Sequence, residues 1–230
     1  MTHIKSIVIP DLHGDSRMLD VILTDFPNHN YIFLGDLIDR GPHSNRVMAK
    51  VRELYQQGRA RIAVGNHEVM AYRGLQLGGS SAFLWDVNGG EETLTSYGDD
   101  YERVREDIHW FFTVAEEYLI GEGSLGKFMV AHAARPRVDK DDRVHGEHHY
   151  WDRPGDQMQP LPEGVLFSIH GHTPLKEVAF DETTQALYLD LGMFRTKRFA
   201  VYQADNNTVH VYYEYKKIQS LNDLILTREI

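Results

Sequence analysis

The sequence predicts an α/β fold in which the first sheet is buried on both faces. Short apolar runs alternate with helix-like stretches in the first third of the chain, and these runs are hydrophobic almost without a break. Strands buried on both faces have this pattern, whereas half-exposed strands alternate between apolar and polar residues. The second half is mostly strand-like. A chain of 230 residues suits one hydrophobic core, so we expect a single domain over residues 1–230.

The first five elements are expected in the order strand, helix, strand, helix, strand. They span Ile4–Pro10, Ser16–Phe26, Tyr31–Gly35, Ser44–Gly58 and Arg61–Gly65. Ser16 and Ser44 are candidate N-caps because a serine oxygen can accept a bond from a first-turn amide. Gly58 is expected to stop the second helix. This order is typical of strands covered by helices.

A helical insert is expected over about residues 69–116, interrupted by the glycine pairs of LGGSS and NGGEE. Trp85 is expected either to pack in the core or to line a substrate rim, and Asn88-Gly89-Gly90 to form a turn. The later strands are predicted at YLIGE, KFMVAH, VLFSIHGH, EVAF, ALYLDLG, RFAVYQ and TVHVYYEY. Arg137–Gln157 is expected to be a polar, loop-rich excursion.

Charge and composition narrow the class of protein. The formal net charge is −10, with 24 Lys and Arg against 34 Asp and Glu, which opposes broad binding to nucleic acid. The chain has no cysteine, which excludes disulfides and thiolate chemistry. No apolar run has the length of an export segment or a membrane span, so we expect a cytoplasmic protein without membrane contact. The oligomeric state stays open.

Metal-ligating residue types follow five of the predicted strands. They are Asp11 and His13, Asp36, Asn66, His132, and the pair His170 and His172. The carboxyl ends of such strands line one crevice, where ligands bind. Singly, each motif also fits a turn, a helix start or a surface histidine, but their joint occurrence favours a metal site. Oxygen and nitrogen ligands suit Mn, Fe or Zn, and a shared carboxylate between two ligand sets is the layout of a two-metal hydrolytic site.

These motifs resemble those of the phosphoprotein phosphatase branch of the calcineurin-like metallophosphoesterases. The family signatures Gly-Asp-x-x-Asp-Arg-Gly and Gly-Asn-His-Glu stand here at residues 35–41 and 65–68. The other matches are Asp11 to Gly14, His132-Ala133, Gly171 to Pro174, and Trp85 to Gly98, which is similar to a stretch of phage and bacterial members. The resemblance implies a four-layer α/β/β/α sandwich with a dinuclear site at the strand ends.

Two positions depart from the family pattern. Pro10 and Ala134 stand where the family carries glycine. We expect Pro10 to alter only a backbone turn, and Ala134 to change the orientation of His132 slightly. Neither departure removes a ligand.

The resemblance implies two divalent cations, with Mn²⁺ expected and Fe or Zn as the alternatives. The first would be held by Asp11, His13 and Asp36. Asp36 would also bridge to the second, which Asn66, His132 and His172 would complete. His170 is off the family's ligand positions and is expected only near the site.

The resemblance also implies a mechanism, in which a hydroxide between the two metals attacks phosphorus in line. His67 would protonate the leaving oxygen as general acid, and Asp39 would orient that imidazole. Arg40 and Asn66 would bind the substrate phosphate, since a guanidinium offers a planar fork to its oxygens.

A second phosphate-binding arginine is expected from the same resemblance. Arg153, in YWDRPGD, is the first candidate, and Arg135 and Arg137 stand behind it. A solvated loop charge is the alternative interpretation of Arg153.

The main functional prediction is a metal-dependent protein serine/threonine phosphatase of bacterial or phage type. Its substrate would be a phosphoprotein or a phosphorylated small molecule. The alternative is a dinucleoside-polyphosphate hydrolase of the diadenosine tetraphosphate type, because bacterial members carry the same motifs. A nucleotide would need stacking aromatics and added arginines at the rim, for which Trp110, Tyr150 and Trp151 are candidates. The complete residue set argues against a non-catalytic module. The net charge, and Pro174 in place of a further histidine, argue against a nuclease.

Overall fold

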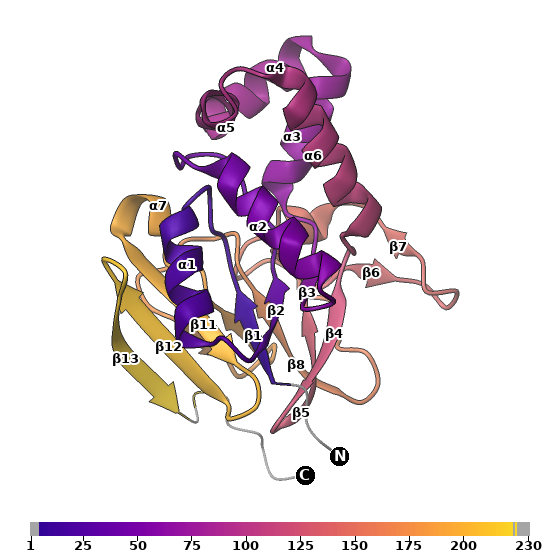
Figure 1. The fold of residues 1–230 in the computed structure, drawn as a ribbon. Coiled ribbons are helices and arrows are strands. Elements are labelled where there is room, and N and C mark those ends of the chain that lie inside the picture. The colour runs from indigo at the N-terminus through magenta and orange to yellow at the C-terminus, as the bar shows by residue number, and fades with distance from the viewer. Residues whose placement is uncertain (1–4, 223, 225–230) are drawn as a thin grey trace.

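The computed structural model of the chain describes residues 5–222 and 224. Two β-sheets pack face to face, and helices cover the outer face of one of them (Figure 1). The mixed α/β fold class predicted from the sequence is therefore confirmed. Whether the chain is one domain over residues 1–230 stays a prediction. No helix among the described residues is long and apolar enough to cross a membrane.

The first sheet has six strands, in the order β13-β12-β11-β1-β2-β3. Its strands are β1 (Ser6–Ile9), β2 (Asn30–Phe33), β3 (Ala60–Ile62), β11 (Arg198–Gln203), β12 (Thr208–Tyr213) and β13 (Lys216–Asn222). β1, β2 and β3 are parallel, so their carboxyl ends meet at one edge. The expected first strand began at Ile4, which lies outside the described residues. The polar, exposed edge strand β13 was not predicted, because it lacks a hydrophobic pattern.

The second sheet has five strands, in the order β4-β5-β8-β10-β9. Its strands are β4 (Leu119–Gly123), β5 (Gly126–Val130), β8 (Val165–His170), β9 (Ala179–Asp181) and β10 (Ala186–Tyr188). β5 and β8 are parallel, and their ends lie beside those of the first sheet. On the outer face of β8, Ser168 and His170 are buried, and Arg135 from an irregular segment bonds to Ser168.

A compact group of aromatic rings joins the inner faces of the two sheets. Phe128 of β5 and Phe167 of β8 stack with their centroids 5.6 Å apart. Both meet Tyr202 of β11 edge to face, at 6.0 and 5.9 Å. All three side chains are buried. Because these residues come from both sheets, their packing fixes how the two sets of strand ends face each other.

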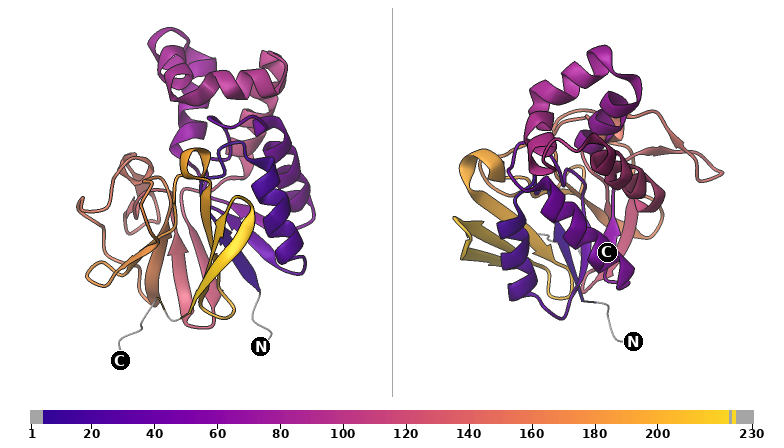
Figure 2. Two further views of the ribbon diagram at one scale, coloured as in Figure 1. Left: turned by 90° about the vertical axis from the view of Figure 1, so that its left-hand side faces the viewer. Right: turned by 45° about the horizontal axis from the view of Figure 1, so that its top comes forward.

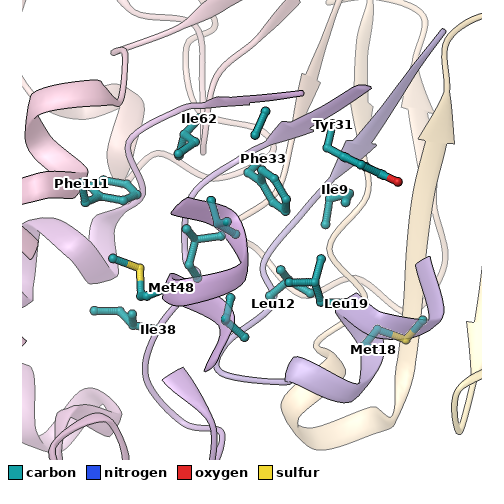
Figure 3. Packing of buried hydrophobic residues seen from close by; sticks show 14 of the residues in the cluster. Ile9, Leu12, Met18, Leu19, Tyr31, Phe33, Ile38, Met48, Ile62 and Phe111 are labelled. Carbon is teal, nitrogen blue, oxygen red and sulfur yellow. The ribbon is translucent and has the colours of Figure 1, made fainter. Parts of the chain in front are cut away.

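Two amphipathic helices cover the outer face of the first sheet. α1 (Ser16–Asp25) and α2 (Ser44–Gln56) bury one face each, and residues such as Leu19 and Met48 pack near Phe33 and other apolar side chains of the strands (Figure 3). The two serine N-caps predicted from the sequence were wrong. The cap of α1 is Asp15, whose carboxylate accepts from Met18 N at 2.9 Å.

For α2 the N-cap position is His43. The Ser44 hydroxyl accepts from Asp39 N and pairs with Thr93 Oγ1 instead of bonding to the helix end. The helix ends at Gln56, and Gly58, with φ 69°, follows in the turn. The stop predicted at this glycine thus lies two residues beyond the last helical residue.

The central part of the chain forms a group of helices above the strand ends (Figures 1 and 2). It comprises α3 (Asn66–Leu77), α4 (Gly79–Trp85), a π-helical turn (Asp86–Gly90), α5 (Glu91–Ser96) and α6 (Tyr101–Val114). The later excursion holds β6 (Arg137–Val138), β7 (Val144–His145) and a 3₁₀ turn (His148–Tyr150), and α7 (Met193–Thr196) follows the second sheet. The predicted helical character of the centre agrees with this arrangement.

Phe128→Ala tests the aromatic contact between the sheets. Removing a fully buried ring leaves a cavity and should lower the free energy of unfolding by about 3–5 kcal/mol, measured by denaturant titration. Tyr213→Ala is the control, because Tyr213 is 45% exposed; its effect should stay within about 0.5 kcal/mol. A Phe128 variant as stable as this control would mean that the ring does not join the sheets.

Candidate metal and phosphate site

The predicted site residues converge where the parallel strands end. Five of them have positive φ angles in place of the usual negative values: His13, Asp36, Asp39, Arg40 and His172. Non-glycine residues with this conformation are uncommon, and they cluster at functional sites because the surrounding structure must hold them. The turns after β1, β2 and β8 therefore aim these side chains into one shared space.

Asp36 lies between two groups of side chains that could hold a metal ion. It belongs to a group with His13 and His67 and to another with His132 and His172, and in each group the possible ligand atoms lie within 4.8 Å of one another. His13 Nε2 is 3.7 Å from Asp36 Oδ2, and His132 Nε2 is 3.4 Å from Asp36 Oδ1. Each oxygen of this carboxylate thus faces one group.

Backbone carbonyls fix the tautomers of two histidines in the site. His13 Nδ1 donates to Ile38 O at 3.0 Å, and His132 Nδ1 donates to Leu34 O at 2.8 Å. A carbonyl oxygen can only accept, so the neutral rings must carry their proton on Nδ1. The Nε2 lone pair of each ring then faces the site, which is the arrangement that a metal ligand needs.

The residues present fit a pair of cations. Asp11 Oδ2 is buried without a hydrogen-bond partner. Asn66 Oδ1 lies 2.8 Å from His132 Nε2 and 2.8 Å from His172 Nδ1. The lone pairs of His132 and Asn66 face each other there, and a cation would satisfy both. An oxygen and nitrogen donor set without sulfur suits Mn, Fe or Zn.

The pKa values of the buried groups in the site also favour bound cations. Burial raises the pKa of Asp11, Asp36 and Asp39 to about 7, and that of Glu68 to about 8. Burial also lowers the pKa of His172 to about 3. Several buried carboxyl groups in one place are costly to ionise unless cations or hydrogen-bond donors compensate them. Bound cations would supply that compensation.

Two tight turns and one buried glutamate shape the centre of the site. A Cβ on Gly65 would lie 2.3 Å from Asp36 N, so no other residue allows the turns after β2 and β3 to approach so closely. Glu68 is buried and accepts from Asp36 N at 3.0 Å and from Leu37 N at 2.7 Å. The sequence analysis gave Glu68 no role. In the structure it fixes the backbone that carries Asp36.

His67 and Asp39 form a buried pair beside this centre. His67 Nδ1 donates to Asp39 Oδ2 at 2.7 Å, and His67 Nε2 lies 3.9 Å from Asp36 Oδ2. The free ring nitrogen therefore faces the cleft. This is the geometry in which a carboxylate orients an imidazole for proton transfer.

A cleft of about 450 Å³ opens over these groups. Asp36, Asn66, His67 and His172 lie at its floor, and the remaining lining residues are Arg40, Asn88, Trp151, Arg153, Thr173, Pro174, Phe194 and Arg195. Arg40 Nη1 donates to His13 Nε2 at 2.8 Å, and its guanidinium lies 4.6 Å from the Phe194 ring centre. Three arginines and two large aromatic side chains thus surround one opening.

Phe194 and Arg195 line the cleft but were not predicted from the sequence. Four residues that were candidates do not line it: Arg135, Arg137, Trp110 and Tyr150. Arg135 is buried and bonds to Ser168 Oγ at 2.9 Å and Gln159 O at 2.8 Å, so it braces the second sheet. Arg137 lies on β6 and does not line the cleft.

The aromatic candidates Trp110 and Tyr150 are used within the fold. Trp110 packs against Tyr55 and Arg52, and the buried Tyr150 bonds to Glu117. Of the three aromatics suggested for nucleotide stacking, Trp151 alone lines the cleft.

His170 is buried beneath the site. Its Nδ1 donates to Ala131 O at 2.8 Å, and its Nε2 lies 2.8 Å from Ser168 Oγ. Both nitrogens have protein partners, and the expectation that His170 does not bind metal stays a prediction.

The sequence of this chain is similar to that of a known protein family. The sequence model of the family described as calcineurin-like phosphoesterase matches residues 4–194. The chain belongs to the calcineurin-like phosphoesterase family. The description of the family names phosphoesterases. The finer assignment to the phosphoprotein phosphatase branch stays a prediction.

Two relatives within this family carry the same name. The chain is 31% identical over 161 residues to the bis(5'-nucleosyl)-tetraphosphatase PrpE [asymmetrical] of Bacillus velezensis, which covers 63% of both chains. It is 29% identical over 202 residues to the protein of that name from Bacillus subtilis, covering 74% of this chain and 79% of the relative. The first alignment spans less than two thirds of the relative's length.

Solved phosphatase structures share the fold of this calcineurin-like phosphoesterase. A cold-active protein tyrosine phosphatase of a Shewanella species aligns with a TM-score of 0.63 at 14% identity, over 96% of this chain and 81% of that chain. A protein serine/threonine phosphatase of Saccharomyces cerevisiae aligns with a TM-score of 0.60 at 15% identity, over 91% and 80%. At this identity the similarity establishes the fold alone.

Asp36→Asn tests the shared position of this carboxylate. Because Asp36 faces both groups, the variant should lose Mn²⁺ binding at both sites, measured by calorimetry and by metal content after gel filtration. Asp25→Asn is the matched control, since the Asp25 carboxylate bonds to Tyr212 away from the cleft. If the Asp36 variant still binds two equivalents as tightly as the control, Asp36 is not shared.

Metal removal should expose the buried carboxyl groups in a pH titration. In the unfolded chain they ionise near pH 4, whereas in the folded metal-free protein Asp11, Asp36 and Glu68 hold their protons to about 7 or 8. These protonated carboxyl groups contribute fully to the free energy of unfolding below pH 4, and this contribution is lost as the pH rises through their pKa values in the folded protein. His172 acts oppositely, since its stabilisation is complete above about pH 6.5 and lost toward about 3.

Between pH 6.5 and 8 the contribution of His172 no longer changes, so the change in stability comes from the carboxyl groups. The Tm of the chelator-treated protein should therefore fall across this interval. Mn²⁺ should raise Tm most at pH 8, because cations bind ionised carboxylates. Scanning calorimetry measures both effects, and a metal-free Tm that rises from pH 6.5 to 8 would contradict this account.

Proposed function

We propose that this calcineurin-like phosphoesterase hydrolyses the phosphoanhydride chain of dinucleoside polyphosphates, with a dinucleoside tetraphosphate as its substrate class. The observation that carries the proposal is the cleft above the metal-ligating residues, with its three arginines and two aromatic rings. The names of the Bacillus relatives support the same substrate class. This was the alternative prediction from the sequence, and it now has better support than the protein phosphatase prediction.

The residues assigned to cation binding are the six named from the sequence. Asp11, His13 and Asp36 would hold one cation, and Asp36, Asn66, His132 and His172 would hold the other. When bound, two divalent cations supply an activated water and neutralise charge on the phosphoryl oxygens. Mn²⁺ is the cation proposed, with Fe or Zn as the alternatives.

The remaining side chains bind and orient the substrate and transfer a proton. The oxygen of one water bonds to phosphorus, the bridging P–O bond breaks, and the displaced phosphate keeps the electron pair. Arg40, Arg153 and Asn66 would hold the oxygens of the phosphoryl group that is attacked. His67, protonated on both ring nitrogens and oriented through Asp39, would deliver the Nε2 proton to the displaced oxygen and become neutral.

The cleft fits a chain of several phosphates better than one phosphate. Arg40 lies beside His13, while Arg153 and Arg195 are exposed and line the cleft from two different connecting segments. A single phosphoryl group does not need three guanidinium groups, whereas a tetraphosphate carries negative charge on each of its phosphates. Trp151 and Phe194 offer faces on which a nucleobase can stack.

A protein serine/threonine phosphatase is the second candidate function. It would use the same floor of the site, and the solved phosphatases share this fold. A phosphoserine leaves as an alkoxide and needs proton donation more than a nucleotide phosphate does, so the Asp39–His67 pair is compatible with it. The arginines and aromatic faces at the rim have no evident use on a single phosphoserine.

Initial rates with Mn²⁺ on diadenosine tetraphosphate, a phosphoserine peptide and p-nitrophenyl phosphate decide between the two functions. We expect kcat/KM for diadenosine tetraphosphate to exceed that for the peptide by roughly 10-fold or more. Chromatography of the nucleotide products gives the bond that is cleaved, since symmetrical cleavage yields two nucleoside diphosphates. Faster hydrolysis of the peptide would establish the protein phosphatase activity instead.

Arg195→Gln tests the contribution of the cleft wall. Loss of one charge-assisted contact should raise KM for diadenosine tetraphosphate roughly 10-fold and leave KM for p-nitrophenyl phosphate nearly unchanged. Arg137→Gln is the matched control, because this exposed arginine does not line the cleft. An Arg195 variant indistinguishable from the control would remove this residue from the substrate site.

A further inference from the structure

The Asp39 carboxylate is held by side chains from the helical part of the chain. Trp85 Nε1 lies 3.0 Å from both Asp39 oxygens, and Thr93 Oγ1 donates to Asp39 Oδ1 at 2.7 Å. Asp39 and Thr93 are fully buried, and Trp85 is 3% exposed. With His67 bonded to Oδ2, Asp39 accepts a hydrogen bond at each of these contacts.

The Thr93 hydroxyl is fully used in this arrangement. Its one proton goes to Asp39 Oδ1, while its oxygen accepts from Asp39 N at 2.9 Å and pairs with Ser44 Oγ at 3.0 Å. One residue therefore binds both the backbone and the side chain of Asp39. Torsions about a carboxylate are soft and roughly two-fold, so two fixed donors are what select one rotation of the group.

A distorted helical turn brings these donors together. Residues 86–90 contain a kink between α4 and α5, at which Gly89 leaves the helical conformation with φ 106°. Gly89 O accepts from Arg40 N at 3.1 Å, and a Cβ on Gly89 would lie 2.6 Å from that nitrogen. The turn thus places the segment 85–93 against both Asp39 and Arg40.

We propose that Trp85 and Thr93 are positioning residues, which rotate the Asp39 carboxylate so that Oδ2 meets His67 Nδ1 and thereby aim His67 Nε2 into the cleft. The inference rests on the proposed role of His67 in proton transfer, and it assigns the control of that role to the helical segment 85–93. Neither residue lines the cleft. Their effect passes through Asp39 to His67.

Thr93→Val removes one donor and keeps the side-chain shape, and Trp85→Phe removes the other donor and keeps an aromatic ring at that position. With phenyl phosphate, whose leaving group needs an acid, each variant should lower kcat roughly 10- to 100-fold. With p-nitrophenyl phosphate, a better leaving group, the loss should be several-fold smaller. Thr93→Ser keeps the hydroxyl and should restore activity on both.

Matched controls and a double-variant cycle separate positioning from general damage. Thr208→Val and Trp110→Phe make the same chemical changes away from the cleft and should leave the ratio of the two rates unchanged. In a His67→Asn background, Thr93→Val should change kcat by no more than about twofold, because its effect passes through the missing imidazole. Bound Mn²⁺ should stay at the wild-type level throughout.

A second readout uses the metal-free protein and no substrate. The proton on His67 Nδ1, in its 2.7 Å bond to Asp39, should give a far-downfield NMR resonance that His67→Asn removes. This resonance should shift or vanish in Thr93→Val and Trp85→Phe and persist in Thr93→Ser.

The inference would be overturned if the resonance were unchanged in both Thr93→Val and Trp85→Phe. It would also be overturned if these variants lost equal kcat on the two aryl phosphates, and if Thr93→Val lost as much kcat in the His67→Asn background as in the wild type. Neither readout uses a dinucleotide. Failure of the proposed substrate class would therefore leave this test intact.

Discussion

The burial of carboxyl groups at one edge of the two sheets is the constraint on which the rest of this structure depends. Asp11, Asp36 and Asp39 are all nearly inaccessible to solvent. Such groups are stable there only when cations or hydrogen-bond donors face them. The left-handed turns, the close approach of Gly65 to Asp36 and the two backbone amides held by Glu68 are the local means by which the chain presents them.

The two halves of the site have different origins. The residues proposed to hold the cations follow strands of both sheets, whose relative position is fixed by the packed rings of Phe128, Phe167 and Tyr202. The groups proposed to act on the substrate depend on connecting segments: the helical segment 85–93, the turn at Trp151 and Arg153, and α7. The fold shared within a family positions the reacting groups, whereas connecting segments such as these determine which substrate binds.

The fold class and the groups that meet at the strand ends could be predicted because their signals are local. Asp36 and Asn66 stand beside glycines directly after apolar runs, and the order of such motifs is readable along the chain. The contacts to Asp39 could not be predicted, since Trp85 and Thr93 lie 46 and 54 residues away and depend on the kink at Gly89. Arg135 was misplaced because charge alone does not distinguish a substrate contact from a buried brace. The serine caps failed for two reasons: Asp15 takes the cap position of α1, and Ser44 bonds to Asp39 N and Thr93 instead of its own helix end.

Anomalous diffraction from crystals grown with Mn²⁺ tests the central claim most directly. The account predicts two peaks roughly 3.5–4 Å apart, with one oxygen of Asp36 beside each, His13 on one side and His132 on the other. A single peak, or peaks that do not share Asp36, would contradict it.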